Sequence, residues 1–401
     1  MFKRSYRKNI GLMAGVEFFA FLGITSFWIL FLSQNGMSLW QIGLLESIFH
    51  ATSVICEIPS GMLADRFSYK TNLYLSRIAG IVSSVLMLAG QGNFWVYALA
   101  MVISAWSYNF DSGTSAAMVY DSSLEAGLKE RYLSISSFMS GVAEATRSLG
   151  TVWAGFFVHG QLHLTYYIMI ATSIIVLFLT WMLKEPSVKA EKSERLTMKK
   201  IIWAVKEELQ RNPSLFIWMI LSQIIGTLMC MFYFYYQNQL PDLEGWQISM
   251  VMLMGSVLNI WAVYLASKIG KRYSALKLFP ILVLLTGGTY LLSYFGTPLI
   301  YILVYLISNA LYALFQPIFD NDLQKRLPSE VRATMLSVYS MMFSLSMIII
   351  FPLTGWLIDY LGFVVAFLYL GLILVLASFL LFFILKEMAG ALKLEEDVIS
   401  K

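Results

Sequence analysis

Apolar segments of about twenty residues recur along the whole chain and leave little room for any fold except a bundle of membrane-spanning helices. A hydrocarbon layer ~30 Å thick is crossed by about 20 residues of α-helix. Only 13% of the residues are charged, which is about half the fraction usual for a soluble domain. We therefore predict an all-α polytopic membrane protein with twelve transmembrane helices. The segments lie at residues 11–32, 40–63, 71–90, 94–118, 133–157, 164–183, 213–236, 246–267, 276–294, 298–319, 333–358 and 363–385.

The basic residues fall on one set of alternate connections. Of the 28 lysines and arginines, 26 lie in the two ends, in every second loop or, for Lys277, at the adjoining end of a span, and only Arg77 and Arg147 lie deep within spans. Because Lys and Arg accumulate on the cytoplasmic side, both termini are predicted to be cytoplasmic in a multi-pass protein of the plasma membrane. The longest basic segment, 184–212, has apolar residues at helical spacing. It is either an amphipathic helix on the inner membrane surface or a solvated linker.

The two halves of the chain repeat weakly. Asp121 and Arg131 before the fifth span correspond to Asp322 and Arg332 before the eleventh. Such repeats indicate two pseudo-symmetric six-helix bundles with a substrate site near mid-membrane. The predicted domains are an N-terminal bundle over 1–183, a cytoplasmic linker over 184–212, a C-terminal bundle over 213–385 and a cytoplasmic tail over 386–401.

A short polar stretch, Gly61-Met62-Leu63-Ala64-Asp65-Arg66-Phe67-Ser68-Tyr69-Lys70, follows the second span. It resembles the signature loop of the major facilitator superfamily of secondary transporters. Ser68 and Tyr69 stand where that family usually has Gly and Arg. The resemblance implies the fold of that family, alternating access and a gating role for this motif. The residues expected to take part are Gly61, Asp65, Arg66, Lys70 and the preceding Glu57.

Ionisable residues within spans are costly, and their default interpretation is functional. The candidates for proton coupling are Glu144, Asp111, Glu46 and Glu17. Glu144 and Arg147 share one helix face with Ser140 and Thr151, so they form either a substrate or proton site or a structural ion pair.

Each of the ionisable residues His50, Asp111 and Arg77 has two possible roles or partners. His50 either takes up protons or packs between helices. Asp111 either titrates or bonds a neighbouring helix, and an ion pair of Arg77 with Glu17 or Asp111 is expected.

The spans of the second half carry uncharged polar and aromatic residues in place of deep charges. Such a wall suits a bulky amphipathic or cationic substrate. The cluster Tyr233–Tyr236 either contributes to this wall or forms an interfacial aromatic belt. Together with Arg147 and His50, the residues expected to line the substrate cavity are Asn259, Tyr305, Asn309, Tyr312 and Gln316.

No hydrolase, kinase or nucleotide-binding motif occurs, so the chain is predicted not to be an enzyme and to need no cofactor except a proton gradient. Its three histidines and two cysteines lack the spacing of a metal site. No nucleic-acid partner is expected. The predicted partners are a small-molecule substrate, protons and the lipid bilayer, and the chain is expected to act as a monomer.

The function that we predict is proton-coupled efflux of a small amphipathic or drug-like molecule. The helix-four motif of known exporters, Arg-x-x-Gln-Gly, is incomplete here, because Asn109 stands at the arginine position. A proton-coupled uptake symporter or a facilitator for a small metabolite is the first alternative. A non-transporting membrane receptor or lipid-handling protein is the second, and binding without flux in vesicles would distinguish it.

Overall fold

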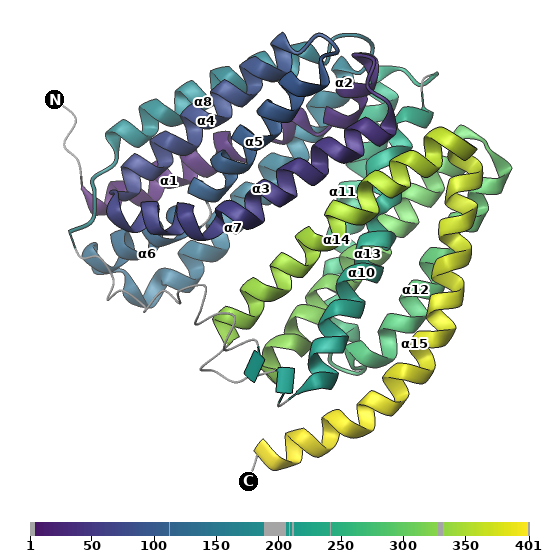
Figure 1. Cartoon of the computed structure of the whole chain (residues 1–401). Coiled ribbons are helices and arrows are strands. Elements are labelled where there is room, and N and C mark those ends of the chain that lie inside the picture. Colours follow the sequence, from purple (N-terminus) through teal and green to yellow (C-terminus); the bar gives the residue numbers. More distant parts are fainter. Residues whose placement is uncertain are drawn as a thin grey trace. The chain divides into compact units, whose positions relative to one another are not determined.

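The computed structural model describes residues 5–111, 113–187, 206–207, 209–210, 212–240, 242–327 and 332–399, without the side chains of 58–66, 333–334 and 387–399. All regular secondary structure in these ranges is helical, which confirms the all-α fold class, and helix occupies each of the twelve predicted spans (Figure 1). Ten candidate spans in the described ranges are long and apolar enough to cross a membrane. The amphipathic helix expected within 184–212 lies almost entirely outside these ranges.

The chain divides into two compact units. The first comprises Met1–Met37, Leu45–Arg195 and Leu243–Met252, and the second comprises Ser38–Leu44, Leu196–Asp242 and Leu253–Lys401. Helices of the first half are α1 (Tyr6–Ala20), η1 (Gly23–Thr25), α2 (Trp28–Gln34), α3 (Leu39–Arg66), α4 (Tyr69–Ala89), α5 (Phe94–Asp111), α6 (Thr114–Glu125), η2 (Lys129–Arg131), α7 (Tyr132–Ala154), η3 (Gly155–Phe157) and α8 (His163–Met182). Within the first unit α4 packs between α5 and α8, and α1 packs on α8 (Figure 1).

Helices of the second half begin after the central connection. They are α10 (Pro213–Tyr235), η4 (Tyr236–Gln239), α11 (Gly245–Ile269), α12 (Ala275–Leu291), η5 (Leu292–Phe295), α13 (Pro298–Arg326), α14 (Arg332–Leu361) and α15 (Phe363–Ile399). In the second unit α12 packs on α13 and α15, and α10 packs on α13 and α14. The helix predicted to end at residue 385 continues to Ile399.

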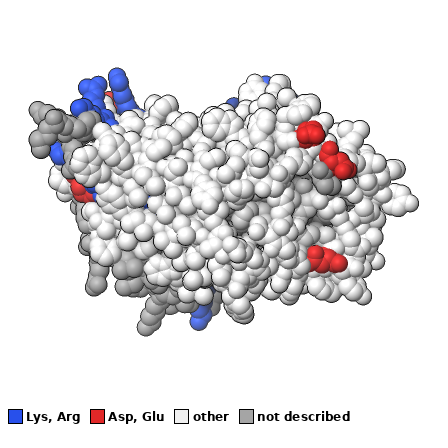
Figure 2. Space-filling model, turned by 90° about the horizontal axis from the view of Figure 1, so that it is seen from above, with Lys and Arg blue, Asp and Glu red and all other residues white. Residues whose placement is uncertain are grey.

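Large apolar side chains cover much of the outer surface. Trp95, Trp153 and Phe383 are each at least 60% exposed, as few aromatic residues of a water-soluble protein would be. In Figure 2 the visible face is nearly all white, with charged side chains at only a few places. This surface suits contact with lipid chains, and the chain is an integral membrane protein with many spans.

The first predicted span, 11–32, is not one continuous helix. α1 ends at Ala20, and the chain passes through η1 before α2 begins at Trp28. At this break Gly23 lies directly against Gly150 of α7, and a Cβ on either glycine would collide with backbone of the other segment. Ser26 and Thr151 hydroxyls form a hydrogen bond of 2.7 Å across the same contact. The close approach of α1, η1 and α7 is what places Arg147 near Phe21.

The fourth predicted span, 94–118, is also divided. α5 ends at Asp111, and α6 begins at Thr114 after Gly113, whose φ of +78° belongs to the left-handed region. Glycine adopts this conformation without the steric cost that a side chain would add. The break leaves Asp111 at the end of a helix, and the Ser115 hydroxyl in the first turn of α6 donates to its Oδ1 at 2.8 Å.

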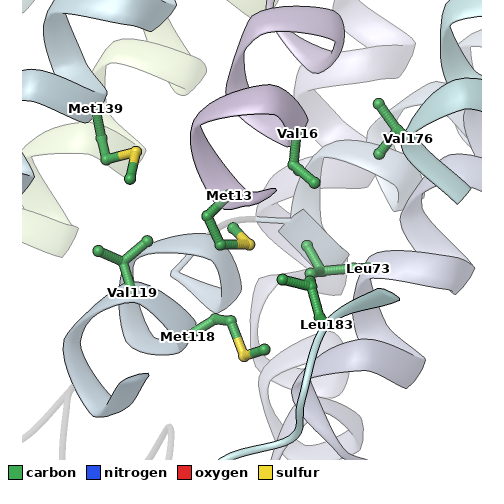
Figure 3. Close-up of a cluster of buried hydrophobic side chains, with 8 residues drawn as sticks. All are labelled: Met13, Val16, Leu73, Met118, Val119, Met139, Val176 and Leu183. Carbon is green, nitrogen blue, oxygen red and sulfur yellow. The ribbon is translucent and has the colours of Figure 1, made fainter. Parts of the chain in front are cut away.

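A buried apolar cluster holds the helices of the first unit together. It joins α1, α4, α6, α7 and α8 with the segment that follows α8 (Figure 3). The side chains of this cluster pack closely against one another, and this packing keeps the helices in a fixed register. The cluster consists of Met13, Val16, Leu73, Met118, Val119, Met139, Val176 and Leu183.

Candidate functional site

A cavity of about 780 Å³ lies within the first unit. This volume is in the usual range for a small-molecule site, ~300–1,000 Å³. Five charged side chains reach its wall from four helices: Glu17 from α1, Arg77 from α4, Asp111 from α5, and Glu144 and Arg147 from α7. Because charges within a membrane bundle are costly and their default interpretation is functional, this cavity is the candidate functional site.

Arg77 and Asp111 form a buried ion pair across α4 and α5. The Arg77 Nη2 lies 2.6 Å from the Asp111 Oδ2, and the two side chains are only 8% and 15% exposed. Ser115 holds the other Asp111 oxygen. The Arg77 Nε is buried and has no hydrogen-bond partner among the described residues. The pair is therefore well ordered, and its guanidinium keeps a spare donor.

Glu17 is a third carboxyl group beside this pair. It is 8% exposed, lines the same cavity and feels the charges of both Asp111 and Arg77. No hydrogen bond to its carboxylate comes from the described part of the chain. Asp111 is the carboxylate bonded to the Arg77 guanidinium, and Glu17 lines the same cavity without a described bond to it. An ionised carboxylate without a partner is costly in such a place, so Glu17 is a candidate for proton coupling in this cavity.

Glu144 and Arg147 lie one turn apart on α7 and differ from the buried pair in access. The Glu144 Oε2 is 3.6 Å from the Arg147 Nη1, and the side chains are 66% and 55% exposed. This distance exceeds the ~2.7–2.9 Å of a good charge-assisted hydrogen bond. The Arg147 guanidinium carbon also lies 5.7 Å from the ring centroid of Phe21, within cation–π range. Both charges are therefore available to a ligand.

Hydroxyl groups and aromatic rings complete the wall. Ser136 and Ser140 continue the polar face of α7 below Glu144, while Phe49 of α3 and Tyr108 of α5 pack with ring centroids 6.2 Å apart. One face of the cavity can donate and accept hydrogen bonds, and another offers apolar surface. The remaining hydroxyl groups in the lining belong to Ser104, Ser107, Ser115 and Tyr132.

The other candidates in and after the second span do not line this cavity. His50 Nε2 is 3.4 Å from Glu46 Oε1 on the same face of α3, and neither residue lines the cavity. Glu57 is exposed near the end of α3. The side chains of Asp65 and Arg66 lie outside the described part of the chain, and Gly61 is described only by its helical backbone.

Among Gly61, Asp65, Arg66 and Lys70 of the signature motif, Lys70 is the residue whose side-chain contacts the structure describes. Its Nζ donates to the carbonyl oxygens of Trp181 and Leu183, at 3.1 and 2.9 Å. The Glu185 carboxylate accepts the backbone N–H groups of Tyr69 and Lys70 at 2.7 and 3.1 Å, which caps α4. The motif is thereby tied to the end of α8 within the first unit.

The cavity candidates of the second half pair among themselves. Asn309 donates to Asn259 at 3.1 Å, and Gln316 donates to the Tyr312 hydroxyl at 2.8 Å. Tyr305 stacks on Tyr236 with ring centroids 4.2 Å apart. All of them belong to the second unit, so none lines the cavity of the first.

The belt interpretation of the cluster Tyr233–Tyr236 is wrong for two of its members. Tyr235 and Tyr236 are fully buried, whereas a belt residue would face the membrane surface. They pack inside the second unit, where the Tyr235 hydroxyl donates to the Phe351 carbonyl at 2.8 Å.

The sequence reasoning named Arg77 only as an ion-pair partner and missed most of the cavity's neutral lining. The pairing of Arg77 with Asp111 depends on which faces of α4 and α5 meet. The periodicity of one helix does not contain that information. Ser136 could have been found, because it precedes Ser140 by one turn on the stripe that holds Glu144. Among the described residues, no group of three His, Cys, Asp or Glu could hold a metal ion.

Comparison with known proteins identifies the family. Residues 10–351 match the sequence profile of the Major Facilitator Superfamily. The fold is similar to that of the nucleoside transporter NupG, with a TM-score of 0.76 and 15% identity over 96% of this chain and 98% of that one. Comparison with curated sequences gave no significant match.

Two further solved structures share this fold. A D-xylose-proton symporter has a TM-score of 0.67 and 14% identity over 94% of this chain and 96% of that one. A bacterial homolog to the human lysosomal transporter Spinster has a TM-score of 0.69 and 14% identity over 97% of each chain. The chain belongs to the Major Facilitator Superfamily, and it is a membrane transporter and not an enzyme.

Proposed function

We propose that the chain is a proton-coupled secondary transporter that moves a small, polar but amphipathic molecule by alternating access. The observation that carries this proposal is the cavity of the first unit, where Glu17 lines the wall that also holds the Arg77–Asp111 ion pair. Adding or removing one proton on Glu17 changes the net charge beside that pair. Such a change in charge balance is a direct way to couple a proton to a conformational equilibrium.

The remaining charges of the cavity are assigned to the substrate. Glu144 and Arg147 are accessible and only loosely paired, so a ligand can replace either contact. Phe21, Phe49 and Tyr108 supply surface for an apolar part of the same ligand. A purely apolar drug would leave the charged and hydroxyl groups of the wall without hydrogen-bond partners. The cost of these unsatisfied groups makes an apolar drug an unfavourable ligand.

Export is the direction that we propose, with both termini in the cytoplasm and the chain working as a monomer in the plasma membrane. With Glu17 ionised, the cavity holds three carboxylates against two guanidinium groups, and this acidic excess supports a substrate that carries a positive group. Proton-coupled uptake remains the competing direction, because a xylose-proton symporter shares this fold.

The test uses purified full-length protein in liposomes that contain a pH-sensitive dye. A thermal-shift screen first identifies ligands that raise the apparent stability of the folded chain. A ligand applied outside then drives protons out of the lumen if the protein is an antiporter, and into the lumen if it is a symporter. Transport of labelled ligand without any pH change would contradict proton coupling. If transport requires sodium, the coupling ion is sodium and not the proton.

Ligand that binds without crossing the bilayer would contradict transport itself. That outcome would favour the receptor or lipid-handling alternative. Empty liposomes and liposomes with heat-denatured protein provide the baseline for leak.

A further inference from the structure

The two ion pairs of the cavity differ in a way that indicates what the ligand looks like. Arg77 and Asp111 are in close contact at 2.6 Å and almost fully buried, so their charges are already satisfied. Glu144 and Arg147 are 3.6 Å apart and more than half exposed. The ligand therefore meets one carboxylate and one guanidinium side by side on the wall formed by α7.

A ligand with a single charge fits this wall poorly. An ammonium alone would draw Glu144 away from Arg147, and a carboxylate alone would draw Arg147 away from Glu144. Either exchange satisfies one charge of the pair and leaves the other without its charge-assisted contact. A neutral ligand cannot compensate either group. Only a ligand with both charges close together can replace the pair without leaving an unpaired charge.

The spacing of the pair limits the ligand to a short zwitterion. Residues three apart on a helix are neighbours on one face, so the two charges lie on adjacent turns of the cavity wall. In an α-amino acid the ammonium and the carboxylate are attached to the same carbon, which matches this separation. A long diamine, or a molecule with distant charges, would match only one of the two groups.

The rest of the wall accommodates the ligand's side chain. Phe21 lies beside Arg147, and the packed rings of Phe49 and Tyr108 line the same space. The volume of about 780 Å³ leaves room for a large apolar or aromatic substituent in addition to the charged end. An α-amino-acid-like molecule with such a side chain is also amphipathic.

We infer that the cavity binds a small α-amino-acid-like zwitterion, with its ammonium on Glu144, its carboxylate on Arg147 and its side chain against Phe21, Phe49 and Tyr108. This inference rests on the proposed transport function, because it names the substrate class of the same site. It adds a specific requirement, namely that both charges of the ligand are recognised at once.

The probes are the protein L-amino acids, assayed by thermal shift of the purified full-length chain. The amino acid that stabilises best is then compared with its amide, which keeps only the ammonium, and with its N-acetyl derivative, which keeps only the carboxylate. We expect each single-charge analogue to bind roughly tenfold to a hundredfold more weakly. No stabilisation by any amino acid, or equal binding of an analogue, would overturn the inference.

Two variants test which residue binds which charged group of the ligand. Glu144→Gln should weaken binding of the amide more than binding of the N-acetyl derivative. Arg147→Gln should weaken binding of the N-acetyl derivative more than binding of the amide. If the pair is merely structural, each substitution should weaken binding of all three ligands alike, and that result would also overturn the inference. Glu46→Gln is the matched control, because Glu46 also belongs to an intrahelical pair but lies outside the cavity.

The outcome separates this inference from the proposed function. If a sugar or a nucleoside is transported with protons and no amino acid binds, the substrate class is wrong and proton-coupled transport stands. If an amino acid binds with both charges required but never moves with a proton, the substrate class stands and the coupling is wrong.

Discussion

The Arg77 guanidinium on α4 lies 2.6 Å from the Asp111 carboxylate on α5, and Glu17 lines the same cavity without a described hydrogen bond to its carboxylate. This arrangement has one positive group for two acidic ones. We propose that Asp111 is a structural charge and that Glu17 is the carboxyl group that changes its protonation.

Removing one member of the Arg77–Asp111 pair should be more damaging than removing both. Arg77→Gln leaves the buried Asp111 carboxylate uncompensated, at a cost of ~3–5 kcal/mol, and Asp111→Asn leaves Arg77 with Glu17 alone to offset its charge. The double variant leaves neutral groups that can bond to each other, so its melting temperature should recover most of the loss. Thermal unfolding in detergent measures all three. Single variants as stable as the parent protein would show that the pair does not support the fold.

Glu144 and Arg147 should behave differently, because both side chains are more than half exposed. Pairs of this kind contribute ~0–1 kcal/mol, so Glu144→Gln, Arg147→Gln and the double variant should all fold normally. We expect all three to lose transport, since each removes a ligand contact. Folding and flux are scored separately in a double-mutant cycle. Restored flux in the double variant would reduce the pair to a structural role.

The contact of α7 with the first helix break can be tested with two glycines of the same helix. Gly150→Ala places a Cβ into the backbone of Gly23 and Ile24, and overpacking of this kind costs about 1–3 kcal/mol. Gly141→Ala meets nothing within 4 Å and should be neutral or stabilising by up to about 1 kcal/mol. Melting temperatures compare the two. Equal effects would show that the close approach of α7 and η1 is not required.

Sequence patterns predicted the spans well, because each span is a long apolar run whose length the membrane thickness dictates. They did not predict the breaks at Gly23 and Gly113. Glycine within an apolar run is compatible with a continuous helix, and only the close approach of α7 to Gly23 and the left-handed φ of Gly113 reveal the interruption.

The candidate site was predicted in part. Glu17, Asp111, Glu144 and Arg147 were all chosen as charges within spans, and the structure places all four around one cavity. Glu46 and His50 satisfy the same criterion yet lie elsewhere, since charge and depth alone do not say which helix faces meet. The pairing of Asn259 with Asn309 likewise requires the packing of α11 on α13.

The first turn of α3 is held by an acidic residue distant in the sequence. Asp359 of α14 accepts the backbone N–H groups of Leu39 and Trp40, at 3.2 and 2.7 Å. A carboxylate at a helix N-terminus satisfies unpaired donors and opposes the helix dipole. Asp359→Ala should therefore cost about 1–2 kcal/mol. Asp359→Asn keeps one acceptor oxygen and should lose less, and a melting temperature unchanged in both variants would contradict this capping role.

The most direct test of proton coupling through Glu17 compares the parent protein with Glu17→Gln in liposomes that contain a pH-sensitive dye. Both proteins should bind the ligand found by thermal shift and exchange labelled for unlabelled ligand across the bilayer. The account predicts that ligand drives a change in lumen pH with the parent protein and no change with Glu17→Gln. A pH change of the same size with Glu17→Gln would contradict it, because the coupled proton would then be carried by another group.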